Sequence, residues 1–153
     1  MAVYVSRNGP AFAATAGAKT VLKLITPTQF AIEVKELAIF TDGVTASAVP
    51  ATWDYFTSDE TTAGSNPATS VTTQISGATH AHGITVGNNF TAEGTTYTVV
   101  KSGYIPQFMG TLILQMPLGD EPESPAGLAD SFGIRINVTA NVNVLAWIKW
   151  ARK

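Results

Sequence analysis

Two histidines have the spacing of a small metal or catalytic site. His80 and His82 stand two residues apart, and on a β-strand this spacing points both imidazoles to the same side, as binding of a transition metal requires. A complete site needs further ligands, but the chain has no cysteine and no acidic residue close to the pair. We therefore expect a solvated pair of loop residues rather than a metal centre.

A second candidate is a group of carboxylates that could offer oxygen ligands to calcium: Asp120, Glu121, Glu123 and Asp130. Pro122 and Pro125 stiffen this stretch, and the spacing of an EF-hand is absent. The sequence favours a charged loop that faces solvent, with no bound metal.

Catalytic motifs are missing from the sequence. It contains no G-x-S-x-G elbow, no P-loop and no H-E-x-x-H. His80 and His82 are the only histidines in the sequence that could serve as a general base. A glycosidase uses two carboxyl groups, and no two of the 11 acidic residues are marked by their positions as such a pair. We predict that the protein is not an enzyme and that it needs no cofactor.

Several aromatic side chains could stack on sugar rings: Trp53, Tyr55, Tyr97, Tyr104, Trp147 and Trp150. In β-sandwiches such residues more often belong to the core or to a subunit interface. Trp150 shares the parity of Val142 and is predicted to point inward, whereas Trp147 and Leu145 lie on the opposite face. Trp147 is therefore the better candidate for a contact with another molecule, and carbohydrate binding remains an alternative.

The elements that would position these residues are β-strands. Runs of valine, isoleucine, threonine and aromatic residues alternate with loops rich in glycine, proline, asparagine and aspartate. About eight principal strands are expected, at residues 19–26, 30–41, 51–57, 68–75, 95–101, 110–116, 130–138 and 142–150. This pattern predicts an all-β, antiparallel sandwich of jelly-roll-like type, and an immunoglobulin-like sandwich remains open.

Two of these segments allow a more detailed prediction. In residues 30–41 the apolar residues change parity near Lys35 and Glu36, which favours a strand with a β-bulge over a helix through residues 32–40. Residues 130–150 contain two alternating runs separated by Ala140 and Asn141, and we expect a C-terminal hairpin. The turn lacks the Asn-Gly or Asp-Gly signature of a two-residue hairpin loop.

Residues 1–18 are poor in large apolar side chains, and Phe12 is the large anchor after a short β-like start at residues 3–5. Such a stretch is typical of an extended arm, although its alanines could also form a short helix. We expect an N-terminal arm at residues 1–18 and a sandwich domain at residues 19–153 that folds without the arm.

Charge and hydropathy narrow the classes of partner. The net charge of −2 conceals basic ends and an acidic middle, with balances of +2 for residues 1–41, +4 for residues 135–153 and −8 between them. This segregation favours oriented docking on another protein, since nucleic-acid binding usually needs an overall basic chain. No apolar run reaches the length of a membrane span, so we expect a soluble protein made in the cytoplasm.

Three stretches resemble the small head-decoration or minor structural proteins of tailed bacteriophages. They are VSRNGPAFAATA followed directly by KTVLKLIT, the stretch MPLGDEP, and the ending RINVTANVNVLAWIKWARK. The resemblance covers most of the chain as a pattern, and it involves no specific chemical motif.

The resemblance implies a jelly-roll-like domain, forming a trimer on the exterior of the virion and clamping subunits of the major capsid protein, with no membrane or nucleic-acid partner. The residues expected to bind partners are Arg7, Phe12, Trp147, Lys149, Arg152 and Lys153. A tail-fibre knob that binds carbohydrate is the alternative. A shell-forming capsid protein is less favoured, because Arg7 is the single charged side chain of residues 1–18.

Overall fold

The structure, a computed structural model, describes residues 1–8, 12–14, 17–43, 49–58, 71–77, 79, 81–88, 90, 93, 96–124 and 130–153. Within these ranges every regular element is a strand. The strands are β1 (Ala2–Arg7), β2 (Phe12–Ala14), β3 (Gly17–Ile25), β4 (Ile32–Gly43), β5 (Ala51–Ser58), β6 (Val71–Ser76), β7 (Thr85–Asn88), β8 (Thr98–Ile105), β9 (Thr111–Gln115), β10 (Glu123–Ser124), β11 (Ser131–Val138) and β12 (Val142–Arg152).

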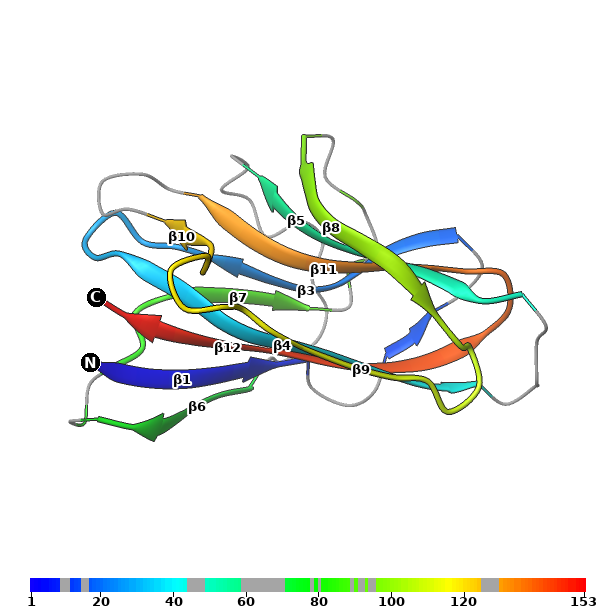
Figure 1. The fold of residues 1–153 in the computed structure, drawn as a ribbon, viewed down its shortest axis with the longest axis horizontal. Coiled ribbons are helices and arrows are strands. Elements are labelled where there is room, and N and C mark those ends of the chain that lie inside the picture. The colour runs from blue at the N-terminus through cyan, green and yellow to red at the C-terminus, as the bar shows by residue number, and fades with distance from the viewer. Residues whose placement is uncertain are drawn as a thin grey trace.

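The strands form two antiparallel sheets (Figure 1). Sheet A has the order β10-β4-β12-β1-β6, with β9 also beside β4 and β2 also beside β12. Sheet B has the order β7-β3-β11-β5-β8. The prediction of an all-β antiparallel sandwich is confirmed.

The core lies between the sheets, and the two C-terminal strands contribute much of it. On β12 the inward residues alternate along the strand and are at most 2% exposed: Val142, Val144, Ala146, Ile148 and Trp150. On β11 the inward row is similarly buried: Phe132, Ile134, Ile136 and Val138. Strict alternation buries one face of each strand because successive side chains point to opposite sides.

The predicted C-terminal hairpin is wrong. Strands β11 and β12 belong to different sheets, where β11 pairs with β3 and β5 and β12 pairs with β1 and β4. Each strand has one strongly apolar face, and these two faces meet across the core instead of lying side by side in one sheet. Residues 139–141 therefore cross between sheets, which is consistent with the missing hairpin-turn signature.

The connections interlock two pairs of consecutive strands. Strand β3 lies beside β11 in sheet B, while the next strands, β4 and β12, lie side by side in sheet A. Strands B, C, E and F of immunoglobulin domains have the same relation, since B and E share one sheet and C and F the other. At these four strands the connections thus follow the immunoglobulin-like alternative.

The predicted β-bulge is confirmed at Lys35. Along the pair β12 and β4, Lys149 lies opposite Glu36 and Trp150 lies opposite Val34, so Lys35 has no counterpart. The extra residue lets both Val34 and Leu37 point into the core, where neither is exposed. It also turns Glu36 outward.

The N-terminal segment is part of the sandwich, which corrects the division into an arm at residues 1–18 and a domain at residues 19–153. Strand β1 lies between β12 and β6 in sheet A, and β3 already begins at Gly17. The Tyr4 ring stacks on Trp150 with centroids 4.5 Å apart, and the Trp150 indole donates a hydrogen bond to the Ser6 hydroxyl over 3.0 Å. The other inward residues of β1, Ala2 and Ser6, are small, and the large Trp150 ring fills the space beside them.

Asn8 continues the sheet where β1 ends. Its side chain donates to the Val144 carbonyl over 2.9 Å and accepts a hydrogen bond from the Ala146 amide over 2.8 Å. The buried amide side chain therefore takes the place of a strand backbone on β12, between the partners of β1 and β2.

The remaining predicted strands agree with the structure except at their ends. Strand β8 runs to Ile105, so Tyr104 is a strand residue instead of a connector residue. The charged loop around Asp120, Glu121 and Glu123 contains the short strand β10, and β7 lies outside the eight expected ranges. Of the strand expected at residues 68–75, residues 68–70 lie outside the described part of the chain.

Replacing Tyr55 with phenylalanine is expected to leave the protein as stable as before or slightly more stable. Tyr55 is fully buried, its hydroxyl has no hydrogen-bond partner among the described residues, and burial raises the pKa of this hydroxyl far above its usual value. Removing an unpaired buried hydroxyl should raise the free energy of unfolding by up to about 1 kcal/mol, measured by urea denaturation. Tyr104→Phe is the control, because Tyr104 is 76% exposed. A clear loss of stability in Tyr55→Phe alone would show that the hydroxyl has a partner.

Candidate functional site

The outward side chains of sheet A form one continuous surface across four neighbouring strands. Register pairing places Arg7 on β1 beside Trp147 on β12, then Ala38 on β4 and Ile113 on β9. The neighbouring row brings Lys149 beside Glu36. We call this surface the outer face of sheet A, and it consists of Val5, Arg7, Glu36, Ala38, Phe40, Ile113, Leu145, Trp147 and Lys149.

Apolar side chains occupy the centre of this face. Ile113 is 54% exposed and Leu145 36% exposed, while Trp147, Phe40 and Val5 are half-buried. Single exposed apolar residues are ordinary on protein surfaces, but a contiguous group with a tryptophan at its centre is typical of a contact surface.

The charged residues of the outer face are available to a partner. Among the described residues neither Arg7 nor Lys149 has an ion-pair partner, although Lys149 lies beside Glu36 in register. Glu36 accepts a hydrogen bond of 3.0 Å from the Gln115 side chain. The face therefore combines an apolar centre with charges of both signs.

The structure brings three of the six predicted partner-binding residues together, namely Arg7, Trp147 and Lys149. Two others have contacts within the chain. The Arg152 guanidinium lies 4.0 Å from the centre of the Phe30 ring, and Lys153 forms ion pairs with Glu123 at 2.9 Å and Glu33 at 3.6 Å.

The sixth, Phe12, has its backbone paired with Val144 of β12, and its side chain lies outside the described part of the structure. Sequence reasoning missed Phe40 and Ile113 as members of the outer face. The run Leu112, Ile113 and Leu114 was a usable signal, because a strand that is apolar on both parities has apolar groups on both faces.

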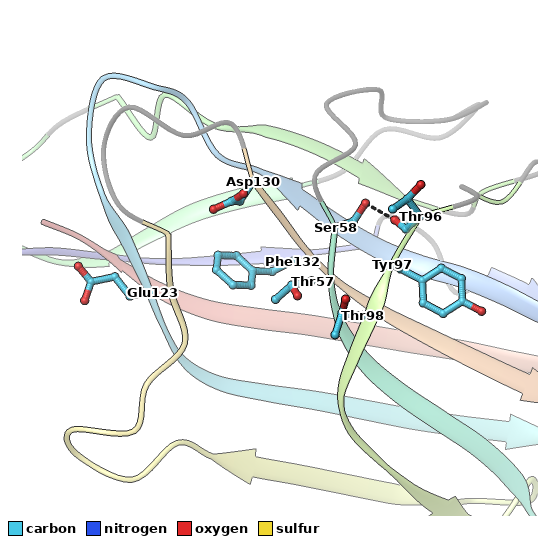
Figure 2. Close-up of a pocket in the computed structure, with 8 residues that line it drawn as sticks. All are labelled: Thr57, Ser58, Thr96, Tyr97, Thr98, Glu123, Asp130 and Phe132. Atoms are coloured by element: carbon cyan, nitrogen blue, oxygen red, sulfur yellow. Dashed lines mark hydrogen bonds between the residues drawn. The ribbon is translucent and has the colours of Figure 1, made fainter.

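A pocket of about 400 Å³ lies where β5 ends and β8 and β11 begin (Figure 2). It is lined by Thr57, Ser58, Thr96, Tyr97, Thr98, Glu123, Asp130 and Phe132. The Ser58 hydroxyl donates to the Thr96 carbonyl over 2.6 Å, and Glu123 lies across the pocket from Tyr97 (Figure 2). Hydroxyl and carboxylate groups could bind a polar ligand here.

The two aromatic residues of this pocket differ in exposure. Phe132 is 2% exposed, whereas Tyr97 is 39% exposed and has the Arg135 guanidinium over its ring, 3.9 Å from the centre. Arg135 also pairs with Asp54 at 3.2 Å. Three of the aromatic residues considered for sugar binding are core residues, since Trp53, Tyr55 and Trp150 are at most 7% exposed.

The acidic loop is tied to the sandwich by lysines. Glu121 pairs with Lys35 at 3.1 Å and Glu123 pairs with Lys153. Hydrogen bonds from backbone amides and from Lys35 lower the pKa of Glu121. Two of the four carboxylates considered for calcium therefore already have cationic partners.

His82 has a buried Nδ1 atom without a hydrogen-bond partner among the described residues, and His80 lies outside them. Within the described ranges, no group of three or more histidine, aspartate or glutamate side chains is placed to hold a metal ion.

In comparisons with known proteins, neither a family model nor a curated protein matches this chain. The part of the chain that the structure describes contains no helix with the length and hydrophobicity needed to cross a membrane.

Proposed function

We propose that this protein is a structural component of a bacteriophage virion, a decoration protein that binds the outside of the head and stabilises contacts between shell subunits. The observation that carries this proposal is the outer face of sheet A. Apolar and aromatic groups flanked by unpaired charges recognise another protein surface through desolvation and charge complementarity, and they perform no chemistry.

The fold supports a passive role of this kind. The outer face is carried by β1, β4, β9 and β12, whose opposite faces form the core, so its side chains have fixed relative positions. A rigid surface loses little conformational entropy on binding. On a symmetric shell many copies bind at once, so modest individual contacts give a stable assembly.

The proposal is tested on particles from cells that produce the protein. We expect peptides of this protein in purified heads, and we expect heads stripped of it to take it up again from solution. The double variant Arg7→Glu and Trp147→Ala should bind stripped heads at least about tenfold more weakly, because it removes the central aromatic ring and reverses a free charge.

Tyr104→Ser provides the matched control, since Tyr104 is 76% exposed but lies on β8 in sheet B. It should bind stripped heads like the unaltered protein. Absence of the protein from purified heads would contradict the proposed function, and full binding by the double variant would remove the outer face from it.

The pocket beside β5 and β8 supports a second candidate, a carbohydrate-binding module or tail-fibre knob. Its hydroxyls and its carboxylates Glu123 and Asp130 are the groups that hydrogen-bond sugar hydroxyls. Titration with a panel of cell-surface glycans decides between the candidates. Saturable binding that Asp130→Ala removes would favour this alternative.

A further inference from the structure

We propose that the outer face of sheet A binds the same face of a second copy of this protein, about a two-fold axis parallel to the strands and between β12 and β4. This inference concerns the same surface as the proposed function, so a second copy and a shell subunit would compete for the outer face of sheet A. A two-fold contact joins two copies, in contrast to the trimer that the family resemblance implies.

The register of β12 and β4 provides the geometric basis. Lys149 lies opposite Glu36, Trp147 opposite Ala38, and Leu145 opposite Phe40. A two-fold axis between the two strands exchanges their positions when the faces meet. Each β12 residue of one copy then faces, in the other copy, the β4 residue that is its own neighbour in register.

Charge complementarity selects this axis over the nearest alternative. With the axis between β12 and β4, Lys149 of each copy faces Glu36 of the other, so two pairs of opposite charges form. An axis along β12 itself would place Lys149 against Lys149. Like charges brought together at an interface are strongly unfavourable, whereas complementary charges fix its register.

The apolar residues fit the same arrangement. Leu145 of each copy faces Phe40 of the other, and both side chains keep exposed surface in the single chain. Trp147 lies opposite the position of Ala38, which its own chain covers completely, so the half-buried indole would meet the side chains around Ala38. The two copies would thus cover each other's partly exposed apolar groups.

The size of the face indicates a contact of modest strength. The four strands of the face, spaced about 4.8 Å apart and roughly 20 Å long, give on the order of 800 Å² of buried surface for two copies together. This lies below the standard size of specific interfaces and is typical of weak, transient contacts. The contact would therefore form at a high concentration of the protein and dissociate on dilution.

The test uses charge reversals in separate copies of the full chain. We expect Lys149→Glu and Glu36→Lys each to weaken self-association at least about tenfold in sedimentation at low salt, because like charges then face each other twice across the axis. An equal mixture of the two variants should associate again. In the mixture, positions 149 and 36 are both acidic in one copy and both basic in the other, so opposite charges again face each other at both contacts across the axis.

Lys19→Glu, on β3 in sheet B, is the matched control and should associate like the unaltered protein. Its mixture with Glu36→Lys should associate only to the extent that Lys19→Glu does alone. Thermal unfolding of each variant shows whether it is folded. Failure of the complementary mixture to associate, or a particle of three copies, would overturn the two-fold contact. A protein that stays monomeric but occurs on purified heads would refute this contact and leave the proposed function intact. A dimer that is absent from purified heads would support this contact and refute the proposed function.

Discussion

Replacing Trp150 with alanine is expected to lower the free energy of unfolding by about 3 to 5 kcal/mol, a large part of the stability of a small domain. The Trp150 side chain is completely buried, stacks on Tyr4 and donates a hydrogen bond to Ser6. Alanine would leave a cavity between the sheets and an unpaired Ser6 hydroxyl next to it. Urea denaturation followed by far-UV circular dichroism measures the loss.

Trp147→Ala is the matched control, because Trp147 lies on the same strand but on the outer face. It should cost only about 1 kcal/mol, since Trp147 keeps part of its surface in water in the folded chain. The effects on self-association should be reversed. Trp147→Ala should weaken self-association directly, whereas Trp150→Ala should affect it only through the loss of folded protein. Equal losses of stability in the two variants would contradict the assignment of inner and outer faces.

Local patterns were sufficient to predict the principal strands and the bulge. The alternation of apolar residues in β11 and β12 marks their buried faces, and the change of parity at Lys35 marks the bulge. Both features depend on residues adjacent in sequence, because the pleat of a strand fixes which side each residue faces. The sandwich follows from the number of such strands.

Pairing between strands could not be predicted in the same way. The two apolar rows of β11 and β12 fit a hairpin and a crossing between sheets equally well, since in both cases the rows face the core. The choice depends on the neighbours, and β3, β5, β1 and β4 occupy the edges that a hairpin would have used. Only the unusual turn at residues 139–141 indicated the crossing.

The outer face of sheet A was predicted only in part, because some of its residues come together through strand pairing. Trp147 and Lys149 share a parity on one strand, so the sequence placed them together. Arg7 joins them because β1 pairs with β12, and Ile113 joins them because β9 pairs with β4. Arg152 and Lys153 were expected to be free, but the chain end lies close to Phe30, Glu33 and Glu123.

Deleting residues 1–8 is expected to abolish folding of the isolated chain. Strand β1 is the strand that connects β6 to sheet A, and its loss would also uncover the inner edge of β12 (Figure 1). Trp150 would lose its stacking partner Tyr4, and the backbone of Val144 and Ala146 would lose the hydrogen bonds of Asn8. Unpaired backbone groups and an exposed strand edge favour aggregation over a native fold.

Far-UV circular dichroism and the solubility of the truncated chain measure this effect, and a synthetic peptide of residues 1–8 gives the sharper experiment. Added to the truncated chain during refolding, the peptide should occupy the open edge of β12 and restore a cooperative unfolding transition, because main-chain pairing of a donated strand supplies affinity. A peptide with Tyr4→Ser and Asn8→Ala should fail, since it lacks the ring that stacks on Trp150 and the amide that pairs with β12. A truncated chain that unfolds at the temperature of the intact protein would instead show that these residues form a separable arm.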